Sequence, residues 1–221
     1  MSAGGAPAAG VVGPRPPRGA DVETLFGGTF DPVHVGHLIV AEHVRDALGL
    51  DRITFVPSGQ PPHKPASSVT AGRHRLAMLE RALAPHAGFA VAGFELEEAA
   101  ASYTIHTVRR LRRQGARAVA LVLGADSLVD LPTWLEPQSL LAESHLIVVA
   151  RPGVDLESVP AAVLAQVCQV DAPRIDIASS TIRARVASRR SIRFLVPEAV
   201  REYIEANGLY RRSPAGDGER A

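Results

Sequence analysis

Short apolar runs alternate with amphipathic helical patterns along most of this chain, and this alternation restricts the possible fold more than any other feature. The runs are rich in Val, Ile, Leu and Phe and lack regular polar alternation, as expected for strands that helices cover on both faces. We expect strands at 22–26, 53–56, 89–94, 118–123 and 146–150, with a weaker one near Ile175. Helices are expected at 36–48, 71–83, 104–114, 138–142, 160–167, 180–188 and 197–207. The pattern predicts an α/β fold, a doubly wound and mostly parallel sheet with helices on both faces.

The two ends of the chain differ in composition from the middle. Residues 1–20 are rich in Ala, Gly and Pro, and residues 211–221 are also poor in apolar side chains, so we expect both to be disordered tails. Residues 21–210 contain no internal repeat and no linker, and we expect them to form a single domain. The N-terminal residues do not resemble a signal peptide, and no apolar run approaches the roughly 18 residues of a membrane span.

Composition excludes several classes of function. The formal net charge is +1, which provides no basic field for nucleic-acid binding, and no aromatic-interleaved basic motif is present. The one cysteine, Cys168, cannot form an internal disulfide or a thiolate cluster, which fits a reducing, cytoplasmic location. Among 24 basic residues there is a single lysine, Lys64, which lies in the proline-rich stretch "PPHKP". A compact, flexible point charge in a rigid loop would suit a phosphate ligand.

The stretch "GGTFDPVHVGHL" lies where the first strand turns into the first helix. Its glycines allow a backbone to approach a ligand closely, and a helix N-terminus favours an anion. His34 and His37 can donate hydrogen bonds to phosphate oxygens and stabilise charge in a transition state. A zinc site is the rival interpretation of the two histidines, but it would need further ligands. The phosphate-binding loop G-x-x-x-x-G-K-[ST] is absent.

Other unusual stretches also follow predicted strands. In open α/β sheets ligands bind at the carboxyl ends of the strands, so residues 27–37, 57–65, 124–134 and 151–153 should meet at one edge. Gly124 and Asp126 suit a nucleotide ribose, although a capping aspartate is the plainer alternative. Trp134 could stack on a flat heterocycle or pack in the core. In "IASSTIRARV", two serines and an arginine at a helix start form either an anion cradle or an ordinary cap.

These stretches resemble a known family. The histidine stretch is similar to the H-x-G-H signature of the nucleotidylyltransferase superfamily, and in its G-G-[ST]-F-D-P form to nicotinate-nucleotide adenylyltransferases. "VPSGQPPHKP", "ASYT", "GAD" with its later tryptophan, and "SSTIR" resemble further motifs of that family, in order, and the resemblance runs from about residue 23 to 210. The last motif departs from the family at Ala178, where Ser is more usual, and at Ser180, where Thr is usual.

The resemblance implies a Rossmann-like sheet and adenylyl transfer from ATP to nicotinate mononucleotide, with Mg²⁺ bridging ATP phosphates and no protein metal ligand. It places catalysis on His34, His37 and Lys64. It implies ATP binding by Gly27, Gly28, Phe30, His34, His37, Gly124, Asp126, Arg151, Ser179, Ser180 and Arg183. It implies binding of the second substrate by Thr29, His63, Lys64, Tyr103, Thr104 and Trp134.

Several alternatives compete with this interpretation. A related transferase could use nicotinamide mononucleotide or pantetheine phosphate, although "PPHK" and "SYT" argue against pantetheine phosphate. A non-catalytic nucleotide sensor would not need transition-state donors such as His34 and His37. A metal-dependent hydrolase is a third class, and dialysis against a chelator would test it. We expect no nucleic-acid and no membrane partner, and a homo-oligomer stays open.

Overall fold

A computed structural model of the chain describes residues 10–59, 69–97, 103–150 and 156–211. Its sheet has seven strands, in the spatial order β1-β7-β6-β5-β2-β3-β4. All neighbouring strands are parallel except β1, which runs antiparallel to β7. The strands are β1 (Val11–Val12), β2 (Val22–Gly28), β3 (Ile53–Pro57), β4 (Phe89–Val91), β5 (Ala118–Gly124), β6 (His145–Ala150) and β7 (Cys168–Asp171).

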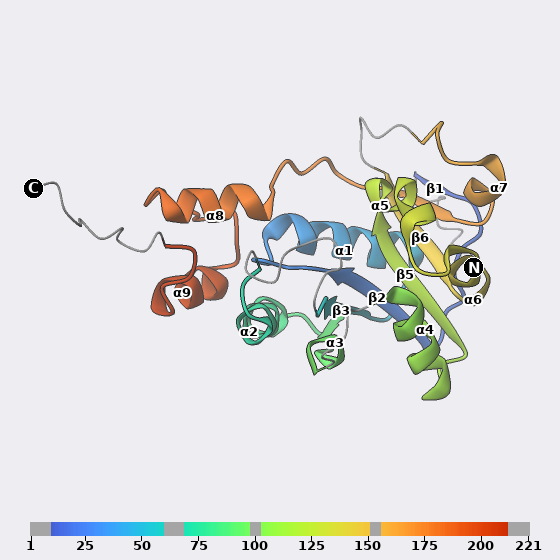
Figure 1. Cartoon of the computed structure of the whole chain (residues 1–221), viewed down its shortest axis with the longest axis horizontal. Coiled ribbons are helices and arrows are strands. Elements are labelled where there is room, and N and C mark those ends of the chain that lie inside the picture. Colours follow the sequence, from blue (N-terminus) through green and yellow to red (C-terminus); the bar gives the residue numbers. More distant parts are fainter. Residues whose placement is uncertain (1–9, 60–68, 98–102, 151–155, 212–221) are drawn as a thin grey trace, which may run out of the picture.

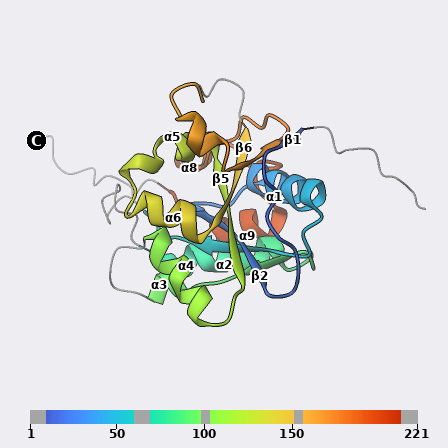
Figure 2. The same ribbon diagram turned by 90° about the vertical axis from the view of Figure 1, so that its right-hand side faces the viewer.

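Helices cover both faces of this sheet, as predicted. Figure 2 shows α4 and α6 on the near face of the sheet, with α1, α2 and α9 behind it. The helices are α1 (Val35–Leu48), α2 (Gly72–Leu83), α3 (Phe94–Glu97), α4 (Thr104–Arg113), α5 (Ala125–Val129), α6 (Pro137–Glu143), α7 (Ala161–Leu164), α8 (Ser179–Ala187) and α9 (Glu198–Ala206), with a short 3₁₀ helix η2 (Leu131–Thr133). Among the described residues, no helix combines the length and the apolar character needed to cross a membrane.

The central strands are apolar on both faces because each face packs against a different layer of helices. In β5, Ala120 and Val122 belong to the core that α1, α2, α8 and α9 close, whereas Val119, Leu121 and Leu123 belong to the core under α4, α5 and α6. The alternation follows from the two-residue period of side chains along a strand. It explains why the sequence shows continuous apolar runs instead of a polar-apolar pattern.

Three expectations about the elements are wrong. Ile175 lies in a loop, and the last strand is β7, only four residues long. The helix expected at 160–167 is α7, which ends at Leu164, and Phe94 begins a short helix instead of ending a strand. Segments this short carry too few side chains for a periodic pattern. Contacts with the rest of the fold, such as the pairing of β7 with the sheet, therefore decide their structure.

The boundary expected for the N-terminal tail is also wrong. The structure describes residues 10–20, and Val11 and Val12 pair with Val170 and Gln169 of β7. This pairing uses main-chain groups at the sheet edge, so a composition poor in large apolar side chains does not prevent it. Residues 1–9 and 212–221 lie outside the described part of the chain.

Candidate functional site

The strand order places the candidate site at one point of the sheet. After the edge strand β1, the chain passes to β2, moves outward through β3 and β4 to the other edge, and then returns to β5 on the other side of β2 (Figure 1). The connections that leave β2 and β5 therefore diverge, and in such sheets ligands bind outside the carboxyl ends of the strands at this switch point. The predicted stretches that follow β2 and β5 thus lie side by side.

Two cavities open at this edge. The inner cavity, of about 270 Å³, lies between the ends of β2 and β5 and the start of α4. Among its lining residues are the predicted Gly27, Gly28, Thr29, Thr104, Gly124 and Trp134. The histidine cavity, of about 210 Å³, is lined by His34, Gly36, His37 and the segment 172–177 that follows β7. Phe26 lines both cavities, so they are neighbours separated by one aromatic side chain.

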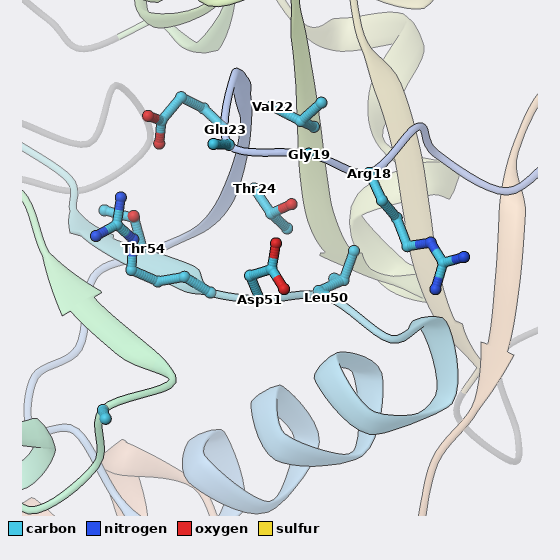
Figure 3. Close-up of a pocket in the computed structure, with 11 residues that line it drawn as sticks. Arg18, Gly19, Val22, Glu23, Thr24, Leu50, Asp51 and Thr54 are labelled. Atoms are coloured by element: carbon cyan, nitrogen blue, oxygen red, sulfur yellow. The ribbon is translucent and has the colours of Figure 1, made fainter.

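A further cavity, of about 340 Å³, lies at the opposite edge of the sheet (Figure 3). It is lined by residues at the amino ends of β2 and β3, where the side chains of Thr24 and Asp51 point toward one another (Figure 3). It contains none of the predicted site residues. Because the carboxyl edge carries the loops that hold ligands in this architecture, the candidate site consists of the inner and histidine cavities.

The two histidines form a stacked pair at the start of α1. Their ring centroids are 3.6 Å apart, and the backbone N–H of His34 donates to Nδ1 of His37 over 3.2 Å. A neutral imidazole that accepts at Nδ1 carries its proton on Nε2, so this bond fixes His37 as a donor through Nε2. The buried Phe30 ring packs edge-on against His37, with centroids 5.0 Å apart. The spacing of three residues therefore places His37 as an oriented donor, with the His34 ring stacked against it.

Gly36 permits the close packing around this pair. A Cβ at residue 36 would lie 3.1 Å from Nδ1 of His34 and 3.1 Å from Cγ2 of Ile175. Any larger residue would therefore push apart the histidine turn and the segment after β7. Gly36 and His37 in the first turn of α1 line this cavity, while the N–H groups of Val35 and His37 donate to the carbonyls of Leu195 and His34, each at 3.0 Å.

The turn before the histidines is held by residues from distant parts of the chain. The Asp31 carboxylate accepts hydrogen bonds from the Thr70 N–H, at 3.1 Å, and from the Tyr210 hydroxyl, at 2.7 Å. Burial and the hydrogen bond to Asp31 raise the pKa of Tyr210 far above its ordinary value. Nη1 of Arg183 donates to the Asp31 carbonyl at 2.7 Å, and the Ser179 hydroxyl donates to the Pro32 carbonyl at 2.9 Å. These two bonds fasten the N-terminus of α8 beside the histidine cavity.

A buried arginine on α2 organises the same region. Arg75 is only 2% exposed, and its guanidinium donates to three main-chain carbonyls: Thr70 at 2.9 Å, Thr29 at 2.9 Å and Gly59 at 3.2 Å. Burial lowers the pKa of Arg75, and the nearby Asp31 carboxylate opposes that shift. Arg75 therefore ties the turn after β2 to both ends of the segment that carries His63 and Lys64.

The inner cavity is closed by residues after β5 and on α4. A Cβ at residue 124 would collide with Oδ1 of Asp126, so only glycine allows that carboxylate to lie over the strand end. Trp134 is half-buried and follows η2. The Thr107 hydroxyl donates to Oε1 of Glu95 at 2.7 Å, and both residues line the cavity. This bond holds the start of α4, where Thr104 is the first helical residue, beside the inner cavity.

The remaining predicted residues are distributed as follows. Phe30 lies in the core and lines neither cavity. Tyr103 precedes the first residue of α4 and is half-buried, whereas the side chains of Asp126 and Ser180 are exposed and line neither cavity. His63, Lys64 and Arg151 lie outside the described residues.

Sequence reasoning missed Arg75, Tyr210 and the segment 172–177. Arg75 precedes Met78 and Leu79 by three and four residues, so it lies on the buried face of α2. A charged residue in an otherwise apolar helical stripe could have indicated a buried, hydrogen-bonded arginine from the sequence. Tyr210 offers no comparable signal, because its partner Asp31 is 179 positions away.

Comparisons with known proteins show which family the chain belongs to. Residues 25–185 match the family model described as Cytidylyltransferase-like. Two proteins named probable nicotinate-nucleotide adenylyltransferase are similar to the chain: one from Thermomicrobium roseum is 47% identical, and one from Roseiflexus castenholzii is 45% identical. Each match covers 85% of this chain, and 90% and 96% of those proteins respectively.

Solved structures give the same fold. The chain superposes on a Plasmodium falciparum nicotinic acid mononucleotide adenylyltransferase complexed with NaAD with a TM-score of 0.72 and 18% identity, over 86% of this chain and 97% of that one. The same enzyme complexed with APC gives a TM-score of 0.70 at 19% identity, over 86% and 96% of the two chains. The structural likeness establishes the Rossmann-like fold, and the sequence relatives establish the family. The chain therefore belongs to the nicotinate-nucleotide adenylyltransferase family of nucleotidyltransferases.

Proposed function

We propose that this chain transfers the adenylyl group of ATP to nicotinate mononucleotide, which yields nicotinate adenine dinucleotide and pyrophosphate for NAD biosynthesis. In this reaction a phosphate oxygen of the mononucleotide bonds to the α-phosphorus of ATP, and the bond from that phosphorus to the bridging oxygen of the β-phosphate breaks. The observation that carries the proposal is the pair of cavities that share Phe26 at the switch point. The histidine cavity is lined by the two imidazoles, and the inner cavity is lined by the Trp134 indole. Two nucleotides, one in each cavity, could therefore bring their phosphates together.

The histidine cavity would hold the reacting phosphates of ATP. Little covalent chemistry falls to the protein in phosphoryl transfer, so positioning and charge neutralisation carry catalysis. The Nε2–H of His37 would donate to an oxygen on which negative charge develops as pyrophosphate leaves. The first N–H groups of α8, the hydroxyls of Ser179 and Ser180, and the Arg183 guanidinium would bind the triphosphate. Arg183 is already held in place by its bond to the Asp31 carbonyl.

Other residues would bind the two nucleosides. Trp134 would stack on the pyridine ring, and the N-terminus of α4 at Tyr103 and Thr104 would receive its carboxylate. The backbone of 27–30 would lie along the phosphates, and Gly124 with Asp126 would bind a ribose. Three residues outside the described part of the chain also belong to this proposal: His63 and Lys64 would bind the mononucleotide, Lys64 as a catalytic residue, and Arg151 would bind ATP.

Adenylyl transfer generally uses a divalent metal ion, and we assign that role here to Mg²⁺. Among the described residues no group of three His, Cys, Asp or Glu side chains could cage an ion. The Asp31 carboxylate, close to the histidines in sequence, already accepts hydrogen bonds on both oxygens. Mg²⁺ commonly keeps several waters and binds through substrate phosphates, so the protein would hold the ion by holding the phosphates. When bound, the ion would neutralise phosphate charge.

Replacing Trp134 with alanine should weaken the pyridine substrate selectively. Loss of one stacking contact of about 0.5–1.5 kcal/mol predicts a rise of roughly 2- to 12-fold in the KM for nicotinate mononucleotide. The KM for ATP should change little, because Trp134 lines only the inner cavity. Steady-state kinetics with each substrate varied in turn would measure the effect, and equal rises for both substrates would contradict the assignment.

A paired assay tests the proposed function itself. The purified protein would be incubated with ATP and Mg²⁺, and with either nicotinate or nicotinamide mononucleotide, while pyrophosphate and dinucleotide are measured. We expect fast turnover with the nicotinate substrate. Equal rates with the two mononucleotides would mean that the pyridine site recognises the shape of the ring and not the charge of its carboxylate. Binding of ATP without product from either mononucleotide would contradict the proposal. The cytoplasmic location expected from sequence remains part of the proposal.

A further inference from the structure

A cavity of about 760 Å³, larger than either cavity of the candidate site, lies between the end of α8 and α9. These two helices lie at the same end of the molecule (Figure 1). The helix α8 begins at Ser179 beside the histidine turn and ends at Ala187 beside this cavity. Its nine residues separate the two places by about 13 Å. We call this second place the arginine cavity, after Arg189, Arg190, Arg193, Arg201 and Arg211, which line it.

Positive charge is concentrated at the arginine cavity. Glu205 also lines it and Glu198 lies beside it, so five positive charges against two negative ones leave a net charge of three. The whole chain has a net charge of only +1. Arg201 pairs with both glutamates, so the excess rests on the other four arginines. Such a cluster repels itself unless an anion is bound.

Arg189, Arg190 and Arg193 form no close ion pair among the described residues, although the charge of Arg193 acts on Glu198, which pairs with Arg201. Other described arginines also lack an ion pair, among them Arg52 and Arg113, whereas Arg45 pairs with Glu42 and Arg117 pairs with Asp21. The arginine cavity differs from those positions because several such cations line one concavity.

The backbone at the end of α8 presents these side chains in a fixed loop. The N–H groups of Arg189 and Arg190 donate to the carbonyls of Val186 and Arg185, at 2.9 and 2.8 Å, which closes the helix with a Schellman motif. Nε of Arg185 also donates to the Ser191 carbonyl at 2.8 Å. The loop is thus held by the protein itself and needs no ligand to form.

Arg189 occupies the position of this motif where glycine is usual. Its φ is +55°, a left-handed conformation that disfavours side chains with a Cβ. Folding alone would therefore favour glycine at residue 189. A long cationic side chain at such a position, on the wall of a cavity, indicates a role in binding.

We propose that the arginine cavity binds an oligophosphate group of three or more linked phosphates. Each guanidinium can make two parallel bonds to phosphate oxygens, so several guanidiniums around one concavity match several phosphates in close succession. The volume is within the range of small-molecule sites. The phosphates of a nucleic acid are separated by sugars along a strand and fit a long groove better than a single concavity. This site is independent of the adenylyl transfer proposed above.

Calorimetric titration of the full chain with sodium tripolyphosphate tests the proposal. The variant Arg190→Ser/Arg193→Ser removes two cations of the cavity, and Arg52→Ser/Arg113→Ser removes two exposed arginines elsewhere as a charge-matched control. We expect the first pair to weaken one binding event by about 100-fold, roughly tenfold for each arginine, and the control to resemble the wild type. Arg183→Ser should leave this event unchanged, because Arg183 lies at the other end of α8. Identical isotherms for the wild type and Arg190→Ser/Arg193→Ser would overturn the proposal.

The variant Arg189→Gly separates binding from structure. It should weaken tripolyphosphate binding and leave the Tm unchanged or higher, because glycine suits the left-handed position. A lower Tm with unchanged binding would show that Arg189 is structural and would overturn its role.

Titration with ATP identifies the source of the phosphates. An ATP binding event lost in Arg190→Ser/Arg193→Ser supports an oligophosphate carried by a nucleotide, whereas binding of tripolyphosphate alone supports a free oligophosphate. Loss of binding to a single-stranded oligonucleotide in that variant, with no tripolyphosphate binding in the wild type, would replace the proposal with a nucleic-acid site.

Discussion

Replacing His37 with alanine should lower turnover by about 100-fold or more, because the variant loses a donor that acts on charge formed in the transition state. The hydrogen bond from the His34 N–H to Nδ1 leaves Nε2 as the protonated, donating atom of the neutral ring. Because His37 is only half-buried at the start of a helix, the fold should survive the substitution. Initial rates of pyrophosphate release, together with a thermal melt, would measure both effects.

His43→Ala provides the matched control for this variant. His43 lies on the same helix, α1, but lines neither cavity of the candidate site. We expect its turnover to remain near that of the wild type. If His37→Ala also turned over at a near-wild-type rate, His37 would have no part in the mechanism.

Replacing Arg75 with methionine should have the largest effect on stability. Methionine fills similar space but removes the three hydrogen bonds from the buried guanidinium to the carbonyls of Thr29, Gly59 and Thr70. Each of these bonds contributes about 1 kcal/mol or more, so the expected loss is about 3 kcal/mol or more of the free energy of unfolding. For a chain of this size that loss corresponds to a decrease in Tm of roughly 6–12 °C.

Arg75→Lys and Arg73→Met complete this experiment. Lysine keeps the charge but cannot make three bonds in the fork geometry of a guanidinium, so part of the loss should remain. Arg73 is exposed on the same helix, and its replacement should change the free energy of unfolding by about 0.5 kcal/mol or less. A Tm for Arg75→Met equal to that of Arg73→Met would show that the three bonds contribute nothing.

The strand–helix order and the candidate site's location could be predicted from sequence because both depend on local patterns. Five predicted strands agree with β2, β3, β4, β5 and β6 to within a few residues, since their apolar runs are long enough to read. The histidine pair could be predicted because its members lie within one helical turn. The short strands β1 and β7 could not, because pairing at the sheet edge decides their structure.

The sequence by itself therefore determined the fold class, the edge of the sheet where the candidate site lies, and the residue types at that edge. Only the tertiary structure decided how those residues are held. Tyr210 and Arg183 reach Asp31 across 179 and 152 positions of the chain, and Arg75 joins three separate segments. No local period encodes such partners, because they meet only after α2, α8 and the C-terminal residues have packed against one another and the sheet.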